Sequence, residues 1–387
     1  MFKVSATPLL ITTAAAVLIA PLHARAFDTE LYGQVHKSFM VFDDGSTTRG
    51  TIVDNNVSST RFGLRAEKQI DYGLTASFLM EMQANGNSSA NLNQTNSATG
   101  TSSGSALGSR HMRAGLGGQW GALFVGQTSS ATDGITEIDL GSVADVLTSS
   151  AGRLAGSLQF RQKNGTLSGI RLNQVSDGFD GIAFAGGSAS DNTNRFGSGF
   201  GDRFNLVRYN SPTFKNTKVS LSYVQGEEID LAVRYNRRWD EMGLDMAMGV
   251  GTVRYDTPQV AAGQNEIDAQ YSGSFSMKHD SGYGLTIASG FRDYNQTAAG
   301  IDEPWFVYTK ASKQMGLWGF AIDYARHDDI DTTFAGDSTV NVWGAGIQRD
   351  LGHGVSATVY GRHHDLERTG TATDALQVYG VNLRAKF

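Results

Sequence analysis

Two short runs combine histidine with aspartate, residue types that often serve as metal ligands or general bases. They are His327-Asp328-Asp329 and His363-His364-Asp365. A zinc site needs three or four converging ligands, and a hydrolase needs a base poised beside a nucleophile. Both runs are expected at junctions between strands and loops, and neither has that ligand spacing. We therefore predict no metal site, no cofactor and no catalytic centre.

Other signals for chemistry are weak. The run Gly197-Ser198-Gly199-Phe200-Gly201 resembles a phosphate-binding loop only by its glycine count, and no helix is expected after it. The chain has no cysteine, which excludes thiolate metal sites and cysteine nucleophiles. The formal net charge of −6 gives no basic footprint for a nucleic-acid partner.

Charged side chains instead recur on one face of alternating segments. Between residues 61 and 70, Phe62 and Leu64 fall on one face of a strand, and Arg61 and Arg65 fall on the other. Segments of about ten residues with this period of two are typical of membrane β-barrels, whose lipid-facing and lumen-facing residues alternate. No segment after residue 26 shows the period of an amphipathic helix.

The end of the chain has the clearest form of this pattern. One face of the last strand is apolar and carries Tyr379, Val381, Leu383 and Phe387. The opposite face carries Asn382, Arg384 and Lys386. A strand that is apolar on one face and charged on the other suits the wall of a barrel with a wet lumen.

The start of the chain resembles an export signal. Met1–Ala26 has a basic residue, an apolar stretch and the cleavage pattern Ala24-Arg25-Ala26, which together indicate a secretory signal peptide. The apolar stretch is shorter than the roughly 20 residues that a membrane-spanning helix needs. We predict cleavage near Ala26 and a single barrel domain over residues 27–387.

Short glycine-containing turns alternate along the chain with long polar connections, the asymmetry expected of an outer-membrane barrel. Between them we predict an all-β fold, a 16-stranded antiparallel transmembrane β-barrel. The predicted strands are 30–42, 59–70, 73–84, 108–118, 121–127, 203–211, 217–225, 229–239, 243–255, 267–279, 283–293, 305–313, 317–327, 338–349, 354–364 and 375–387. An even number of strands leaves no open edge.

One connection, Thr128–Asp202, is much longer than the others. Inside it, Arg153–Lys163 alternates well and Asn164-Gly165 signals a hairpin. This hairpin could add two strands to the wall and make eighteen. Structureless loops of this length are usually either functional or misread. We favour the alternative, a long loop folded into the lumen.

Four stretches resemble the Gram-negative general porins of proteobacteria. Leu31-Tyr32-Gly33-Gln34-Val35 is similar to the first strand of that family, and residues 58–65 are similar to the second. Arg208-Tyr209-Asn210-Ser211-Pro212-Thr213-Phe214 resembles a strand-and-turn motif of the family. The strand that ends in Phe387 is the fourth stretch.

The resemblance implies a homotrimer of barrels in which the third long loop constricts each pore. In such porins, wall arginines face carboxylates on that loop. The matching wall positions are Arg61, Arg65 and Arg113, with Arg153 as a further member of the cluster. The matching loop acids are Asp133, Glu137 and Asp139.

It further implies an outer-membrane location, contact with outer-membrane lipid, and insertion by the assembly machinery through the terminal strand. The expected function is passive diffusion of ions and small hydrophilic solutes through a water-filled channel. Three alternatives stay open: a substrate-selective sugar or anion channel with eighteen strands, a barrel enzyme, and an adhesin that binds through its long loops.

Overall fold

The computed structural model describes residues 27–84, 86–95, 107–180, 203–224, 228–253, 266–296, 302–331 and 334–387. The predicted signal peptide and the glycine-rich run at 197–201 lie outside these ranges. No helix in the described ranges is long and apolar enough to cross a membrane.

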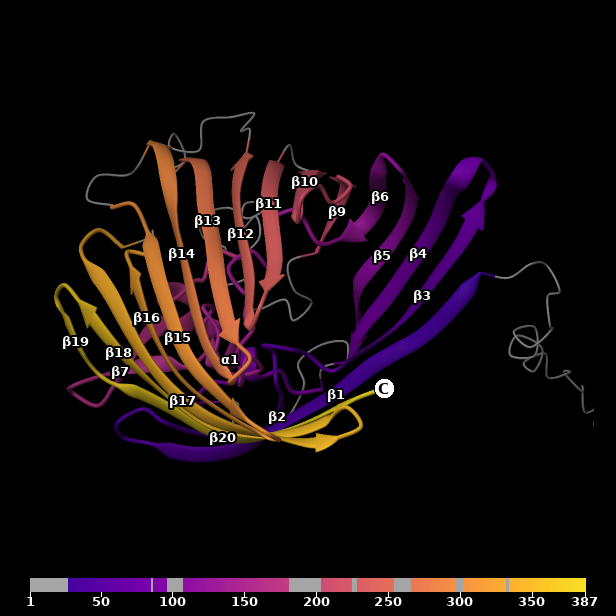
Figure 1. Ribbon diagram of the computed structural model, residues 1–387. Helices are drawn as coiled ribbons and strands as arrows, with labels where there is room; N and C mark the ends of the chain where they lie inside the picture. Colours follow the sequence, from indigo (N-terminus) through magenta and orange to yellow (C-terminus); the bar gives the residue numbers. More distant parts are fainter. Residues whose placement is uncertain are drawn as a thin grey trace, which may run out of the picture.

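The chain forms a closed antiparallel β-barrel (Figure 1). Of the twenty strands in the described ranges, sixteen make the wall, as predicted: β1 Asp28–Asp43, β3 Arg61–Ile70, β4 Leu74–Ala84, β5 Leu107–Gly118, β6 Gly121–Thr128, β9 Phe204–Asn210, β10 Thr217–Val224, β11 Glu228–Trp239, β12 Met242–Val253, β13 Glu266–His279, β14 Tyr283–Gln296, β15 Trp305–Met315, β16 Trp318–Asp328, β17 Ser338–Gly352, β18 Val355–Arg368 and β20 Leu376–Lys386. The first and last strands pair from Gln34 with Lys386 to Asp43 with Gln377, which closes the ring.

Four further strands lie within connections: β2 Thr48–Asp54, β7 Gln159–Gln162, β8 Leu167–Arg171 and β19 Thr371–Asp374. In the part of the chain that the structure describes, four single-turn helices accompany them: η2 Asp71–Gly73, η3 Ser89–Asn91, α1 Gly152–Ala155 and α2 Leu172–Val175. β6 pairs directly with β9, from Ala122 with Asn210 to Thr128 with Phe204. The β7–β8 hairpin is therefore not part of the wall, and the eighteen-strand alternative is wrong.

The alternation of side chains gives the wall two different faces. On β20, Tyr379, Val381 and Leu383 are each about half exposed on the outside, whereas Asn382 is 1% exposed on the inside. The terminal residue is fixed in the ring, because Phe387 and Gly33 exchange two backbone hydrogen bonds of 2.9 and 3.0 Å. A Cβ at Gly33 would lie 2.6 Å from the Phe387 ring, so this close approach requires glycine.

Two connections that were predicted to be loops contain β-strands. The connection at 43–58 contains β2, which pairs with residues 37–43 of β1. The connection at 364–374 contains the last residues of β18 and the whole of β19. β2 also explains Lys37, which falls on the apolar face of β1. Its ammonium lies 2.5 Å from the carboxylate of Asp54, at the end of β2.

The residues between β6 and β9, 129–203, are called the long loop below and are described as far as Asp180 and again at Arg203. Its helix α1 lies within the ring of strands (Figure 1).

Candidate functional site

The first half of the long loop follows the inner face of the wall. Thr132 donates its backbone N–H and its hydroxyl to Asp230 on β11, at 2.7 and 2.6 Å. Ser274 on β13 donates to the carbonyl of Ile135 at 2.5 Å. Further along, Lys310 on β15 donates to the carbonyl of Ser142 at 2.9 Å, and Thr358 on β18 donates to Asp145 at 3.1 Å. The loop is thereby bonded to strands around much of the ring.

Glycines on the inner face of the wall give the loop room. A Cβ at Gly249 on β12 would lie 2.8 Å from the Thr132 methyl group. A Cβ at Gly346 on β17 would lie 2.6 Å from a methyl group of Val143. Real Cβ atoms do not approach neighbours this closely, so a side chain at either position would displace the loop.

A buried apolar cluster fills one side of the lumen. It joins inward-facing wall residues to the long loop, and its members include Met40, Phe42, Val340, Val342, Leu376, Val378, Leu154, Leu158, Phe160, Leu172 and Val175. The wall contribution comes from β1, β14–β18 and β20. The charged residues described next lie on the other side, on β3–β5 and β9–β11.

Glu81 on β4 is the centre of one charged group. Its carboxylate lies 2.6 Å from the Nε of Arg110 and 3.6 Å from the Nε of Arg61. The hydroxyl of Tyr32 donates to the same carboxylate at 2.8 Å. Arg61 is thus on the inner face, where its pattern places it, and it is paired with a wall acid rather than with the long loop.

Four more cations line the next strands and are called the basic wall: Arg113 on β5, Arg208 on β9, Lys218 on β10 and Arg234 on β11. The guanidiniums of Arg113 and Arg208 lie 4.0 and 5.5 Å from the ring centre of Phe124. Lys218 is close enough to Arg208 and Arg234 to be repelled by both. Within the described ranges, none of the four forms an ion pair with a carboxylate.

Two members of the basic wall hold the start of the long loop through its backbone. Arg208 donates to the carbonyl of Ser129 at 3.0 Å, and Arg234 donates to the carbonyl of Asp133 at 2.7 Å. Because these acceptors are neutral, neither contact supplies a counter-charge, and the carboxylates of Asp133 and Asp230 attract both arginines without forming an ion pair with them.

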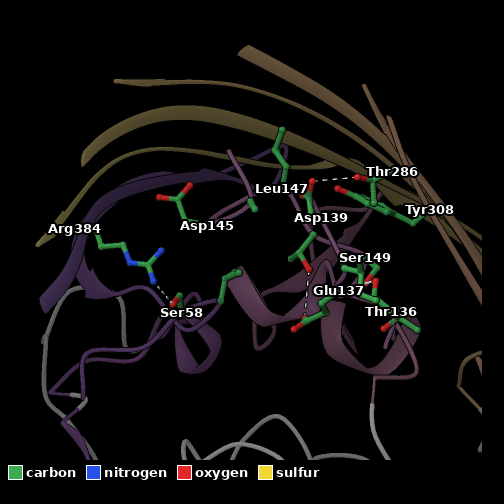
Figure 2. A pocket seen from close by; sticks show the side chains of 14 residues that line it. Ser58, Thr136, Glu137, Asp139, Asp145, Leu147, Ser149, Thr286, Tyr308 and Arg384 are labelled. Carbon is green, nitrogen blue, oxygen red and sulfur yellow. Dashed lines mark hydrogen bonds between the residues drawn. The ribbon is translucent and has the colours of Figure 1, made fainter. Parts of the chain in front are cut away.

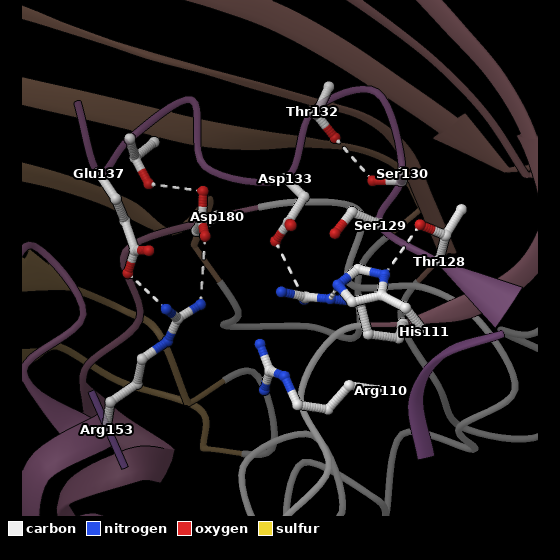
Figure 3. A network of polar contacts seen from close by, with 12 residues as sticks. Arg110, His111, Thr128, Ser129, Ser130, Thr132, Asp133, Glu137, Arg153 and Asp180 are labelled. Carbon is white, nitrogen blue, oxygen red and sulfur yellow. Dashed lines mark hydrogen bonds and ion pairs between the residues drawn. The ribbon is translucent and has the colours of Figure 1, made fainter. Parts of the chain in front are cut away.

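Asp133 lies beside cations, as its predicted position implies. Its carboxylate is 3.4 Å from Arg203, next to His111 and Arg110 (Figure 3). Burial alone would raise the pKa of Asp133, but Arg203, the hydrogen bond from Ser129 and the more distant Arg153 and Arg110 together hold the pKa below its usual value. The carboxylate is therefore ionised and neutralised at neutral pH.

Arg153 was predicted as a wall residue, and the structure places it on α1 of the long loop instead. Its guanidinium donates to Glu137 at 2.5 Å and to Asp180 at 3.2 Å (Figure 3). All three residues belong to the long loop. Arg153 thus neutralises the loop's own acids rather than facing them from the wall.

Asp139 does not face the early-strand arginines that were predicted to oppose it. Its carboxylate forms an ion pair with the buried Lys310 on β15 and accepts a hydrogen bond of 3.1 Å from Thr286 on β14. The loop has already passed the arginine side of the ring when it reaches residue 139.

Arg65 is on the inner face but closer to the short turns than Arg61. Its Nε lies 3.5 Å from Glu30, and its guanidinium lies 4.2 Å from the ring centre of Tyr32. No contact with the long loop is found for Arg65 or Arg113 among the described residues. Their part in a constriction stays a prediction.

A cavity of about 190 Å³ separates the long loop from the wall (Figure 2). On the loop side it is lined by Thr136, Glu137 and Asp145. On the wall side Arg384 reaches in from β20 and donates to the hydroxyl of Ser58 at 3.0 Å. Charged and hydroxyl side chains share the lining with apolar ones such as Ile138 and Leu147.

The period of two did not predict that the side chain of Arg110 faces the lumen. A register shift between Glu81 and Met82 leaves Arg110 as an extra residue, because Glu81 pairs with His111 and Met82 pairs with Ser109. Such a β-bulge turns two successive side chains toward the same face. Arg203 and Asp180 were also missed, since both lie in a connection with no regular pattern.

The run 327–329 lies at the end of β16, at a junction as predicted, whereas the run 363–365 lies inside β18 and not at a junction. His327 and His364 are both buried in the lumen. Within the described ranges, no group of three histidine or acidic side chains converges as a metal site would require.

A closed barrel that is apolar outside and lined with charged side chains inside has the design of a membrane channel. The family model described as "Gram-negative porin" matches residues 12–369. The chain belongs to this family. It is therefore an outer-membrane channel for passive diffusion, and its localisation is the outer membrane, in contact with lipid.

Solved structures support the fold. The anion-selective porin from Comamonas acidovorans is 16% identical with a TM-score of 0.58, and the match covers 93% of this chain and 99% of that one. Salmonella typhi OmpF in complex with daunomycin is 12% identical with a TM-score of 0.55, covering 93% and 98%. A trimer form of OmpT, an outer membrane protein of Vibrio cholerae, is 11% identical with a TM-score of 0.51, covering 94% and 100%. A search of curated proteins finds no match.

Proposed function

We propose that this porin prefers anions over cations. The observation that carries the proposal is an imbalance of charge compensation in the lumen. The four cations of the basic wall have no carboxylate partner in the described ranges. Three acids of the long loop have cationic partners: Asp133 has Arg203, Glu137 has Arg153, and Asp139 has Lys310.

Fixed charges at the narrow part of a water-filled pore select among ions. Uncompensated cations raise the local concentration of anions, and compensated acids repel them little. The solved porin from Comamonas acidovorans is itself named as anion-selective, which agrees with this reading. The solutes we expect are small hydrophilic ions, with anions favoured.

We also propose that the long loop narrows the pore between its own acids and the early strands. In this proposal Arg61 and the basic wall line one side of the narrow part, and Asp133, Glu137 and Arg153 line the other. Support comes from the bonds that Arg208 and Arg234 make to the loop backbone. Asp139 belongs to the anchoring of the loop and not to this opening.

The test of the anion preference is the reversal potential of single channels in a KCl gradient. Arg113→Ser and Arg208→Ser should each lower the ratio of anion to cation permeability. A unit charge at about 4 Å in water contributes about 1 kcal/mol, which corresponds to roughly fivefold in ion occupancy.

Arg349→Ser is the matched control for this test. Arg349 lies on β17 opposite Trp318 and stacks over its ring at 4.6 Å, on the outer face of the wall. The control removes the same charge outside the pore and should leave the ratio unchanged. Equal ratios in Arg113→Ser and Arg349→Ser channels would contradict the proposal.

We propose a homotrimeric assembly, inserted by the outer-membrane assembly machinery through the terminal strand. The trimer form of Vibrio cholerae OmpT and the membership of the porin family support the assembly. Conductance that closes in three equal steps, together with one band of trimer size in unboiled gels, is the expected result.

We propose further that the mature chain begins at Phe27 and that it is not an enzyme. N-terminal sequencing of protein from outer membranes tests the first point. Membership of a channel family supports the second, and lipase and protease assays on folded protein that retains conductance test it.

A further inference from the structure

The middle of the long loop leaves the lumen and joins the rim of the barrel. β7 of the long loop pairs with β19, the short strand in the connection between β18 and β20. Gln162 lies opposite Thr373, and Arg161 lies opposite Asp374. The backbone N–H of Lys163 donates to the carbonyl of Ala372 at 3.1 Å. The long loop is thus joined through backbone pairing to the last connection of the chain.

An ion pair joins the same hairpin to the first connection. The guanidinium of Arg161 donates to both carboxylate oxygens of Asp44, from Nε at 3.0 Å and from Nη2 at 2.7 Å. Asp44 is fully buried, and it also accepts the backbone N–H of Thr47 at 2.8 Å. Paired hydrogen bonds of this kind fix orientation as well as distance.

Gln94, in the connection between β4 and β5, also binds both Asp44 and the hairpin of the long loop. The side-chain amide of Gln94 donates to Asp44 at 3.2 Å and to the carbonyl of Gln159 at 2.7 Å. The N–H of Gln159 donates back to the Gln94 side chain at 3.2 Å. Four connections therefore meet at Arg161 and its neighbours.

The arrangement is linked to the pore by a short buried segment. Arg153, which binds Glu137 and Asp180, lies on α1, and β7 begins a few residues later at Gln159. Leu154 and Leu158 between them are buried in the apolar cluster of the lumen. The chain between the rim and the pore is packed along its length, so the position of the hairpin sets the position of Arg153.

We propose that Asp44 and Arg161 form a clasp that holds the long loop at one position and so keeps the pore open at a constant width. Both are positioning residues, since neither touches the pore. The clasp acts through the hairpin on Arg153 and on the loop acids bound to it. The inference rests on the channel function but not on the direction of ion preference.

The experiment records single-channel current at constant voltage for the full-length protein and for Asp44→Asn. This variant keeps the size of the side chain and removes the charge that holds Arg161. Closing events should become at least about tenfold more frequent, equivalent to about 1.4 kcal/mol of lost anchoring. The reversal potential should stay unchanged, which separates the clasp from the proposed anion preference.

Asp43→Asn is the matched control. Asp43 is the neighbouring acid, and its carboxylate accepts from Gly45 and Thr48 of the same connection, at 2.8 and 2.5 Å. Its loss should leave closing events at the frequency of the unmodified channel. Should Asp44→Asn not insert, Arg161→Lys serves instead, because lysine keeps the charge but cannot make the two-point contact.

An engineered disulfide tests whether holding the hairpin in place is enough to keep the channel open. Gln162 and Thr373 are directly paired across two strands, a spacing that a disulfide can bridge, and the chain has no other cysteine. In the triple variant with Asp44→Asn, Gln162→Cys and Thr373→Cys, oxidation should return the frequency of closing events to that of the unmodified channel. Reduction of the disulfide should raise the frequency again. Asp44→Asn channels as quiet as those of Asp43→Asn, or closures that oxidation leaves unchanged, overturn the proposal.

Discussion

Arg153 and Glu137 are bound to each other at 2.5 Å within a single loop. A porin-like constriction was expected to set wall arginines against loop acids. Here the loop carries its own counterion, which also reaches Asp180. The loop therefore presents little net negative charge to the pore, and the cations of the wall dominate the field.

Arg153→Met is expected to move selectivity toward cations. It removes one positive charge and uncovers two carboxylates at the proposed narrow part, so its effect on the reversal potential should exceed that of Arg113→Ser. Adding Glu137→Gln to Arg153→Met should recover part of the anion preference. A reversal potential unaffected by Arg153→Met would contradict the assignment of this arginine to the pore.

Anion preference should fall as ionic strength rises. The Debye length is about 10 Å at 0.1 M salt and about 3 Å at 1 M, so concentrated salt screens the basic wall from an ion in the pore. Reversal potentials measured at one fixed concentration ratio, in dilute and then in concentrated KCl, test this. Identical permeability ratios in both would point to selection by size and not by charge.

The clasp should resist mild acid. Burial alone would raise the pKa of Asp44, but the hydrogen bonds from Arg161, Thr47 and Ser46 outweigh it and lower the pKa. A carboxylate with a depressed pKa stabilises the fold above its unfolded pKa of about 3.9, and this stabilisation is lost as pH falls through the folded value.

Closing events should therefore stay rare from pH 7 down to about pH 4 and increase only below that range. Asp374 also acts on Arg161, so Asp374→Asn is measured alongside to separate the two carboxylates. A rise in closing events centred well above pH 4 in the unmodified channel is inconsistent with Asp44 as the titrating group.

The wall glycines in contact with the long loop, Gly249 and Gly346, should tolerate no side chain. Gly346→Val would place atoms where Val143 now lies, so the loop should shift and the conductance should change. Gly361→Ala on β18 is a milder control, since its nearest neighbour is the Tyr379 ring on the outer face, at 3.1 Å. Unchanged conductance in Gly346→Val channels would argue against a loop seated on the wall.

The terminal strand should be sensitive on its outer face. Val381→Arg would place a charge against lipid at a cost of about 2–4 kcal/mol near the midplane, and Phe387→Ala would remove the aromatic end. Both should reduce the amount of heat-modifiable, folded protein in outer membranes. Lys386→Ser, on the inner face, is the control, and an equal loss in all three variants would contradict a specific part for the apolar face.

The wall could be predicted from the sequence because lipid outside and water inside impose a period of two on every strand. β2 could not, since the polar residues around it do not alternate. It pairs with residues 37–43 of β1, a stretch that β3 does not cover. The position of Arg110 depends on a β-bulge in the pairing of β4 with β5, which the sequence of β5 alone does not reveal. In each case the missing information lay in pairing between distant segments.

The site was predicted less completely for a related reason. The period of two places Arg61 and Arg113 on the inner face, but it cannot say which acid each one meets. Arg153 alternates with its neighbours as a strand residue would, yet packing of Leu154 and Leu158 into the lumen cluster favours a helical turn. Asp139 meets Lys310 because the loop runs around the wall, a path that no local pattern contains.

The most direct test of the account is the reversal potential of the unmodified channel in a gradient of dilute KCl across a planar bilayer. The account predicts large, stable conductance steps and a potential whose sign reports faster passage of chloride than of potassium. A potential of the opposite sign from correctly inserted protein would contradict the central claim that the uncompensated basic wall governs the pore.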